Sequence, residues 1–206
     1  MNDILKILVE FFTYSIIAIG AQNAIFTRAL GLSSGMRILN DPRKNIFYFC
    51  GALTVFQVMT SVIVYFVMPL ISAAGFAHLR RFVLPTVIVM ACTVSYVVVV
   101  ALLSIVASKE KFKELIQSVT SASITGAIVG TVLLTNYQGL NLLQSIGFGL
   151  GSSVGYLLAM LLISEGDRKI DHSKVPESLR GLPITLVYIS VLALAVYGLT
   201  GHAVAL

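Results

Sequence analysis

Charged residues divide this chain into uncharged stretches that are much longer than the core helix of a soluble protein. The clearest stretches run from Asn45 to Ala77, from Phe82 to Ser108 and from Leu115 to Ser164. A membrane-spanning helix needs about 20 mostly apolar residues, so the third stretch is long enough for two helices. Charged side chains are costly in hydrocarbon, and all three stretches exclude them. The pattern predicts an all-α integral membrane protein.

Six spanning helices account for the pattern over the whole chain. We place them near residues 5–27, 46–72, 82–107, 117–135, 140–164 and 182–204. Between the fourth and fifth spans, the short sequence Asn136–Gly139 suits a sharp reversal because Asn and Gly favour turns. We expect a single membrane domain over residues 1–206.

The distribution of lysine and arginine predicts the orientation of these spans. The loops after the first, third and fifth spans hold 11 of the 14 basic residues, and the opposite side holds Lys6, Arg80 and Arg81. Loops on the cytoplasmic side of a membrane carry an excess of basic residues. We therefore expect a multi-pass protein of the inner (cytoplasmic) membrane, with both termini outside and those three loops in the cytoplasm.

Composition excludes several other classes of protein. Charged residues make up 11% of the chain, against about 25% in soluble domains. The net charge of +5 arises from loops beside the spans, so we expect contact with membrane lipid and no nucleic-acid binding. Cys50 and Cys92 lie within apolar stretches and share no CxxC spacing, which indicates core thiols rather than a disulfide framework or a zinc site.

No catalytic or metal-binding constellation is visible in the sequence. The three histidines, His78, His172 and His202, fall in loops or near a terminus, and nearly all acidic residues lie in loops. Glu10 is the exception, near the outer end of the first span, where an interfacial carboxylate is the usual case. We therefore assign neither catalytic residues nor metal ligands.

Polar residues interrupt the first and fourth spans. The first contains Gln22 and Asn23, and the fourth contains several hydroxyl side chains up to Thr125, followed by Gly126 and Gly130. Such groups either form interhelical hydrogen bonds, worth about 1 kcal/mol, or mark broken helices around a site. Irregular helices at corresponding places in two halves indicate inverted repeats. We expect two inverted three-helix repeats, about residues 1–108 and 109–206, whose first and fourth spans are broken half-helices.

Small residues predict where helices pack closely. Gly147, Gly151 and Gly155 recur every four residues on the fifth span and form one flat face, which suits a close helix–helix contact. In the second span, Gln57 is a strongly polar residue deep in an apolar stretch, and we expect it to hydrogen-bond to another helix.

Three segments resemble one known family. The segment from Asn23 to Leu32 resembles the first-span motif of the A/E-type (D/E-type in Nqr) membrane subunits of the Rnf and Nqr ion-translocating electron-transport complexes. Asn141–Ser145, with the glycine-rich span after it, is similar to that family. So is Val175–Gly181, where the family has a Val-Pro-x-x-Phe-Arg-Gly segment. The resemblance covers nearly the whole chain.

This resemblance implies a two-iron two-sulfur cluster near the membrane midplane, held between two homologous subunits that each give two cysteines. It also implies electron transfer between flavin and iron–sulfur subunits, coupled to sodium or proton movement. The first cysteine position of the family is occupied here by Ser33, and the second falls in the Thr125–Gly130 segment, at Gly126. Such clusters need thiolates, so we expect this chain to supply no cluster ligand.

Three functions remain open from the sequence. The first is a membrane subunit of an Rnf/Nqr-like complex, which forms a homo- or heterodimer with a homologous chain beside flavin or iron–sulfur subunits. The second is a small-solute or ion transporter whose polar lining comes from Gln22, Asn23, Ser33 and Thr125. The third is a non-redox membrane scaffold whose basic loops bind a partner or anionic lipid.

Overall fold

The computed structural model describes residues 2–39, 46–73, 75, 79–106, 109–170 and 175–200. In chain order the helices are α1 (Asn2–Ile19), α2 (Leu32–Leu39), α3 (Ile46–Ala73), α4 (Arg80–Val106), α5 (Lys109–Ser123), α6 (Gly126–Tyr137), α7 (Leu142–Lys169), the 3-10 helix η2 (Glu177–Leu179) and α8 (Leu182–Thr200). These described residues contain no strand, which confirms the all-α class.

Four helices, α3, α4, α7 and α8, are long and apolar enough to cross a membrane. Together α5 and α6 form a fifth candidate, bent by 46° at the break between them. Helix α1 carries three charged residues, Asp3, Lys6 and Glu10, within its 18 residues, so its crossing does not follow from length and composition. The described residues thus contain four or five candidate spans, and the six expected spans are not confirmed.

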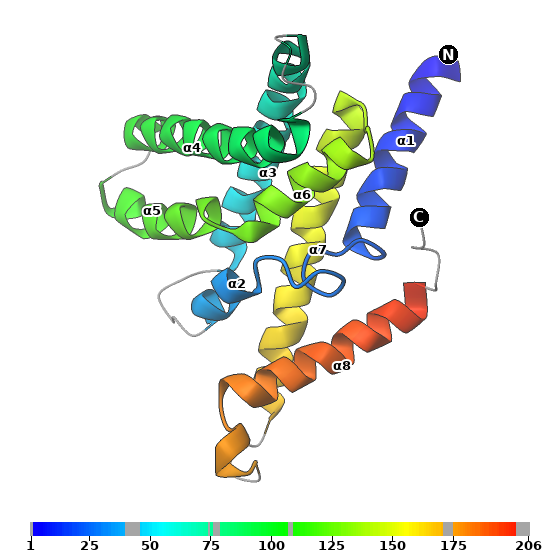
Figure 1. Cartoon of the computed structure of the whole chain (residues 1–206). Coiled ribbons are helices and arrows are strands. Elements are labelled where there is room, and N and C mark those ends of the chain that lie inside the picture. Colours follow the sequence, from blue (N-terminus) through cyan, green and yellow to red (C-terminus); the bar gives the residue numbers. More distant parts are fainter. Residues whose placement is uncertain are drawn as a thin grey trace.

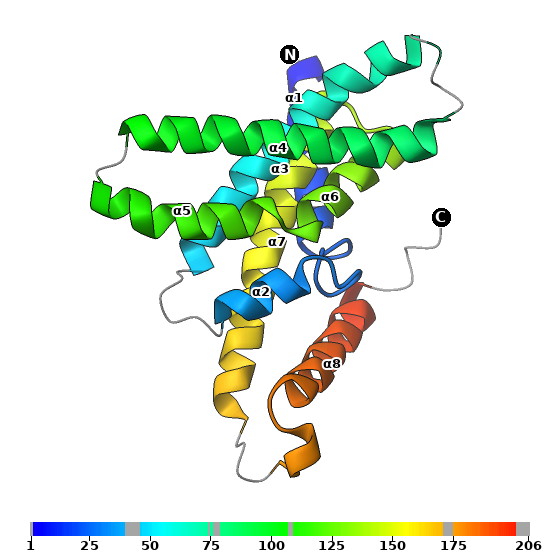
Figure 2. The same ribbon diagram turned by 60° about the vertical axis from the view of Figure 1, so that its left-hand side comes forward.

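Helix α7 forms the centre of the molecule, with α1 packed along one side and α3 along another (Figure 1). Helix α4 packs against α3 and α5, and the two views show α4 and α5 as a stacked pair (Figure 2). Helix α6 turns away from the line of α5 and leads back to the start of α7. Helix α8 packs beside α7 near the opposite end of the molecule.

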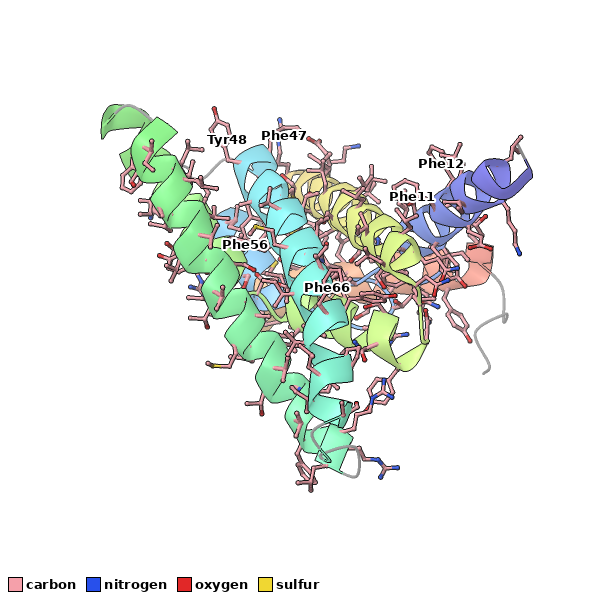
Figure 3. The ribbon with its side chains drawn as sticks, turned by 90° about the horizontal axis from the view of Figure 1, so that it is seen from above. Phe11, Phe12, Phe47, Tyr48, Phe56 and Phe66 are labelled. Atoms are coloured by element: carbon pink, nitrogen blue, oxygen red, sulfur yellow. The ribbon has the colours of Figure 1, made fainter. Side chains whose placement is uncertain are left out.

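Apolar side chains pack in the interior and are also exposed on the outer surface. The interior holds fully buried aromatic rings, among them Phe56 and Tyr156. Phe12 and Phe47 are 58% and 62% exposed and point away from the bundle (Figure 3). Leu199 on α8 is 87% exposed. Extensive apolar surface of this kind marks a contact with lipid or with another protein.

The reversal between α6 and α7 lies two residues later than predicted. Helix α6 continues through Asn136 to Tyr137, so the predicted turn at Asn136–Gly139 is wrong at its start. Gly139 adopts a positive φ of 64°, a conformation that commonly ends helices and is least strained for glycine. Asn141 then caps α7 in a capping box with Gln144.

Candidate functional site at two helix breaks

The first break separates α1 from α2, and the buried side chain of Asn23 organises it. Its Oδ1 accepts hydrogen bonds from the backbone N–H groups of Ile25 (3.0 Å) and Phe26 (3.2 Å). Its Nδ2 donates to the carbonyl oxygens of Ile19 (3.0 Å) and Gly155 (2.9 Å). The amide thus uses both donors and both acceptor positions. It satisfies backbone groups that a continuous helix would have paired, which an apolar environment requires.

The second break lies between α5 and α6. Thr125 has an extended conformation, with φ −81° and ψ 128°, and forms the N-cap position of α6. Its buried hydroxyl donates to the carbonyl oxygen of Ser121 at 3.4 Å. The neighbouring Ile124 side chain is 77% exposed. The predicted interruptions of the first and fourth segments are therefore present, at residues 20–31 and 124–125.

The two breaks touch each other, although about a hundred residues separate them in sequence. Gly31 has φ 74°, and a Cβ atom there would lie 2.9 Å from Cγ2 of Thr125 and 3.1 Å from Cβ of Ala127. A Cβ atom on Gly126 would lie 3.9 Å from the backbone nitrogen of Gly31. In Figure 2 the loop before α2 lies beneath the α5–α6 junction. Gly31 therefore permits a close approach that a side chain would prevent.

The four polar residues expected to line a site have different surroundings. Asn23 and Thr125 are buried at the two breaks. Gln22 is half-buried, and its Oε1 accepts a 3.1 Å hydrogen bond from Nε2 of Gln138 in the α6–α7 turn. Ser33 is exposed on the first turn of α2. In the described part of the chain, no hydrogen bond joins any two of these four residues.

The glycines of α7 lie against α1, which runs parallel to it. A Cβ atom on Gly147 would come within 2.7 Å of the carbonyl oxygen of Phe11, and one on Gly151 would overlap the carbonyl of Ser15. At Gly155 it would come within 2.9 Å of the carbonyl oxygen of Ile19. These contacts bring the backbones of α1 and α7 close together directly before the first break.

A buried polar cluster joins α3, α6 and α7. Nε2 of Gln57 donates to the hydroxyls of Thr131 (3.1 Å) and Ser152 (3.3 Å), and the hydroxyl of Ser153 donates to Oε1 of Gln57. The interhelical role expected for Gln57 is confirmed. The sequence analysis did not identify its three hydroxyl partners. Their positions on helices rich in small residues could have indicated them.

A mostly apolar cavity of about 420 Å³ lies beside the second break, between α4 and the α5–α6 junction. Cys92, Tyr96, Thr120, Thr125 and Gly126 line it. The Cys92 thiol donates to the carbonyl oxygen of Ser123 at 3.1 Å. The sequence did not reveal that Cys92 and Gly126 line one cavity, because the two residues are on different helices.

The described residues contain no group of three or more His, Cys, Asp or Glu side chains that could hold a metal ion. At the middle of α1, Oε2 of Glu10 accepts a 2.9 Å hydrogen bond from Nε2 of Gln144. The three histidines considered in the sequence, His78, His172 and His202, lie outside the described residues.

Comparison with known proteins gives relatives of two related kinds. The E-type subunit of the Na(+)-translocating NADH-quinone reductase from Psychromonas ingrahamii is 37% identical over 79 residues, 38% of this chain and 39% of that protein. The A-type subunit of the ion-translocating oxidoreductase complex from Aromatoleum aromaticum is 35% identical over 75 residues, 36% of this chain and 39% of that protein. Its counterpart from Buchnera aphidicola is 26% identical over 122 residues, 53% of this chain and 60% of that protein.

The matched stretch thus spans about two fifths of the length of the first two relatives. A family model described as "Rnf-Nqr subunit, membrane protein" matches residues 11–203, and so includes both helix breaks and the glycine face of α7. The chain therefore belongs to the Rnf-Nqr family of membrane subunits.

Proposed function

We propose that this chain is an A/E-type membrane subunit of an Rnf/Nqr-like ion-translocating electron-transport complex. The observation that carries the proposal is the meeting of the two helix breaks at Gly31 and Thr125. The sequence resemblance sets the cluster-ligand positions of the family at Ser33 and Gly126, close in sequence to these two contact residues. The two helix breaks are therefore packed together in this chain around the place where its family holds a redox group.

The proposed topology has six spans in two inverted repeats. Helix α1 and the break that follows it form the first span, and α5 and α6 form the interrupted fourth span. An interruption at the start of each half is the pattern expected of inverted repeats. The distribution of basic residues supports an orientation with both termini outside and with the loops after the first, third and fifth spans in the cytoplasm.

In this proposal the chain gives no ligand to an iron–sulfur cluster. The resemblance implies two cysteines from each of two chains, and the donor set here does not fit that requirement. Ser33 offers a hydroxyl and Gly126 offers no side chain, whereas such clusters are held by thiolates. Cys92 is the thiol that lines the cavity beside the second break. A homologous membrane subunit, with flavin or iron–sulfur subunits, then carries the electrons.

The test is gentle anaerobic purification of the full chain with whatever co-purifies, followed by iron, acid-labile sulfide and visible absorption measurements. We expect redox subunits and a homologous membrane subunit to co-purify. Iron should remain with those partners when this chain is dissociated. Cys92→Ala should leave the iron content of the complex unchanged.

Two results would contradict parts of this proposal separately. Stoichiometric iron on the isolated chain, lost in Cys92→Ala, would overturn the absence of cluster ligands and leave the assignment to a complex standing. An iron-free chain that purifies alone or as a homodimer, without redox subunits, would overturn the assignment to a complex and favour a transporter or a scaffold.

A further inference from the structure

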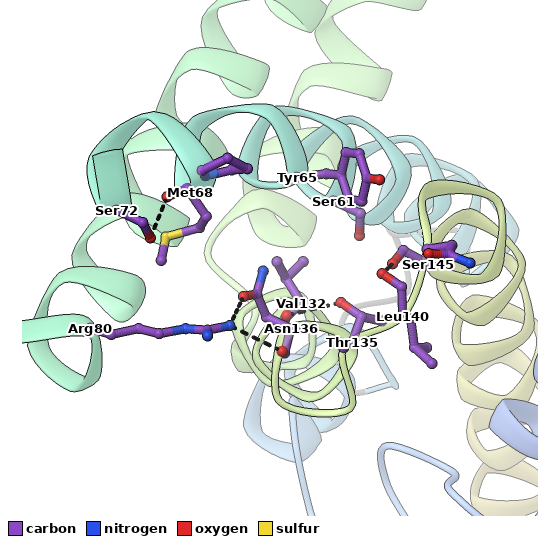
Figure 4. Close-up of a pocket in the computed structure, with 13 residues that line it drawn as sticks. Ser61, Tyr65, Met68, Ser72, Arg80, Val132, Thr135, Asn136, Leu140 and Ser145 are labelled. Carbon is purple, nitrogen blue, oxygen red and sulfur yellow. Dashed lines mark hydrogen bonds between the residues drawn. The ribbon is translucent and has the colours of Figure 1, made fainter. Parts of the chain in front are cut away.

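A second cavity, of about 370 Å³, lies at the end of α6 remote from the helix breaks. It is bounded by α3, the first residue of α4, the end of α6 and the start of α7 (Figure 4). Its polar lining includes Ser61, Ser72, Arg80, Thr135, Asn136 and Ser145. Val132, the first residue of α6 that lines the cavity, lies seven residues after Thr125, which is about 10 Å along the helix.

Arg80 gives this cavity a positive charge that no described acidic side chain balances. Its Nη2 donates to Oδ1 (3.1 Å) and to the carbonyl oxygen (3.4 Å) of Asn136, which holds the guanidinium at the cavity (Figure 4). Among the described residues, no carboxylate lines the cavity and no ion pair joins Arg80 to an acidic side chain. A guanidinium has five N–H donors, so several remain free for a ligand.

Ser61 adds a buried hydroxyl that lacks a partner. Its side chain is on α3, the residue is 3% exposed, and Oγ has no hydrogen-bond partner in the described part of the chain. In Figure 4 this oxygen points toward the space above Val132 and Thr135. The neighbouring hydroxyls of Ser72 and Thr135 are already bonded to helix carbonyls, at 3.0 and 2.9 Å. A buried hydroxyl without a partner is costly, so an acceptor placed in the cavity would satisfy Ser61.

The start of α7 also favours a negatively charged ligand in this cavity. Asn141 and Ser145 from its first turn line the cavity, and the N-terminal end of a 28-residue helix carries partial positive charge. A cation, an unsatisfied hydroxyl and the positive end of a helix all favour a ligand that is negatively charged and rich in acceptors. We propose that this cavity binds a phosphate group, as the headgroup of an anionic phospholipid or as free phosphate, between Arg80 and Ser61.

The site is tested with the full chain in an uncharged detergent. Binding of phosphatidylglycerol is measured by native mass spectrometry, and binding of inorganic phosphate by the thermal midpoint against sodium chloride of equal ionic strength. We expect saturable binding of at least one probe. Binding of the lipid alone would identify a headgroup site, and binding of both probes would identify a site for the phosphate itself.

Variants distinguish the cavity from general surface charge. Arg80→Gln should weaken binding by about tenfold, because it removes a charge-assisted hydrogen bond. Arg81→Gln changes the same charge at the next residue, which does not line the cavity, and should leave binding within about twofold of the parent. Ser61→Ala should weaken binding without lowering the thermal midpoint of the ligand-free protein, because the lost hydroxyl has no partner there.

Three results would overturn the proposal. One is no saturable binding of either probe to the parent chain. Another is an equal loss of binding in Arg80→Gln and Arg81→Gln, which would indicate surface charge alone. The third is unchanged binding in both Arg80→Gln and Ser61→Ala.

Discussion

The hydroxyl of Tyr156 in α7 donates a 2.7 Å hydrogen bond to the carbonyl oxygen of Gly31, at the end of the first helix break. The ring of Tyr156 is fully buried and lies 5.7 Å from the ring of Phe49, centroid to centroid. Gly31 in turn contacts Thr125 at the second break. Through Tyr156, the central helix α7 is therefore bonded to the end of the first break, at the point where that break meets the second.

Tyr156→Phe should test this connection with little change in volume. The carbonyl of Gly31 keeps a hydrogen bond from the backbone N–H of Gly35 at 3.0 Å, so the loss is limited to one bond. We expect a decrease of about 1 kcal/mol in the free energy of unfolding, measured by denaturation in mixed detergent micelles. Tyr137→Phe is the matched control, because that residue is 66% exposed, and it should have no measurable effect. Equal effects of the two variants would contradict a stabilising role for the hydroxyl of Tyr156.

Asn23→Ala should have a larger effect. It leaves two backbone N–H groups and the carbonyl of Gly155 without their side-chain partner in an apolar interior. We expect a loss of about 2 to 3 kcal/mol in the free energy of unfolding, because unsatisfied buried groups carry the full cost of desolvation. Amide hydrogen exchange of residues 20–31 should also become faster.

Gln138→Ala serves as the comparison for Asn23→Ala, because it removes an exposed amide hydrogen bond to Gln22. Its cost should stay below about 1 kcal/mol. Unchanged exchange at residues 20–31 in Asn23→Ala would mean that the loop conformation does not depend on this side chain.

How well the sequence predicts a feature of this structure depends on how far apart in the chain the interacting residues lie. The apolar stretches predicted α3, α4 and α8 to within a few residues, because a span has a characteristic length and charges bound it. The interruptions at Asn23 and Thr125 were visible as polar residues within such stretches. Both signals are local in the chain.

Contacts between distant segments could not be predicted in the same way. That Gly31 lies against Thr125, or that Cys92 and Gly126 line one cavity, depends on how the helices pack, and no single stretch of sequence encodes it. The unpartnered hydroxyl of Ser61 looks like any helix serine in sequence, since most of them bond to a carbonyl four residues earlier.

Gly151→Leu should separate α1 from α7. Even a Cβ atom at Gly151 would overlap the carbonyl of Ser15. That carbonyl belongs to the backbone of α1, which cannot rotate out of the way as a flexible side chain could. We expect a loss of about 3 kcal/mol or more in the free energy of unfolding and a lower yield of folded protein in detergent. Gly51→Leu makes the same change on α3 where nothing lies within 4 Å, so yield and thermal midpoint should stay near those of the parent. Equal yields and midpoints for both variants would contradict a close contact through the glycine face.

Single cysteines at the two ends of α7 should report opposite sides of the membrane. Helix α7 has 28 residues and is about 42 Å long, which exceeds the roughly 30 Å hydrocarbon core. Tyr137 precedes it and is 66% exposed, and Ser178 follows it and is also exposed. In sealed vesicles with the cell exterior facing outward, an impermeant maleimide should label Tyr137→Cys, and label Ser178→Cys only after permeabilisation.

The parent chain is the control for background labelling, because both native thiols are buried, Cys50 at 4% and Cys92 at 8% exposure. Labelling of both sites from the same side would contradict a membrane-crossing α7. Labelling of Ser178→Cys alone before permeabilisation would reverse the orientation derived from the basic loops, since those loops would then lie outside.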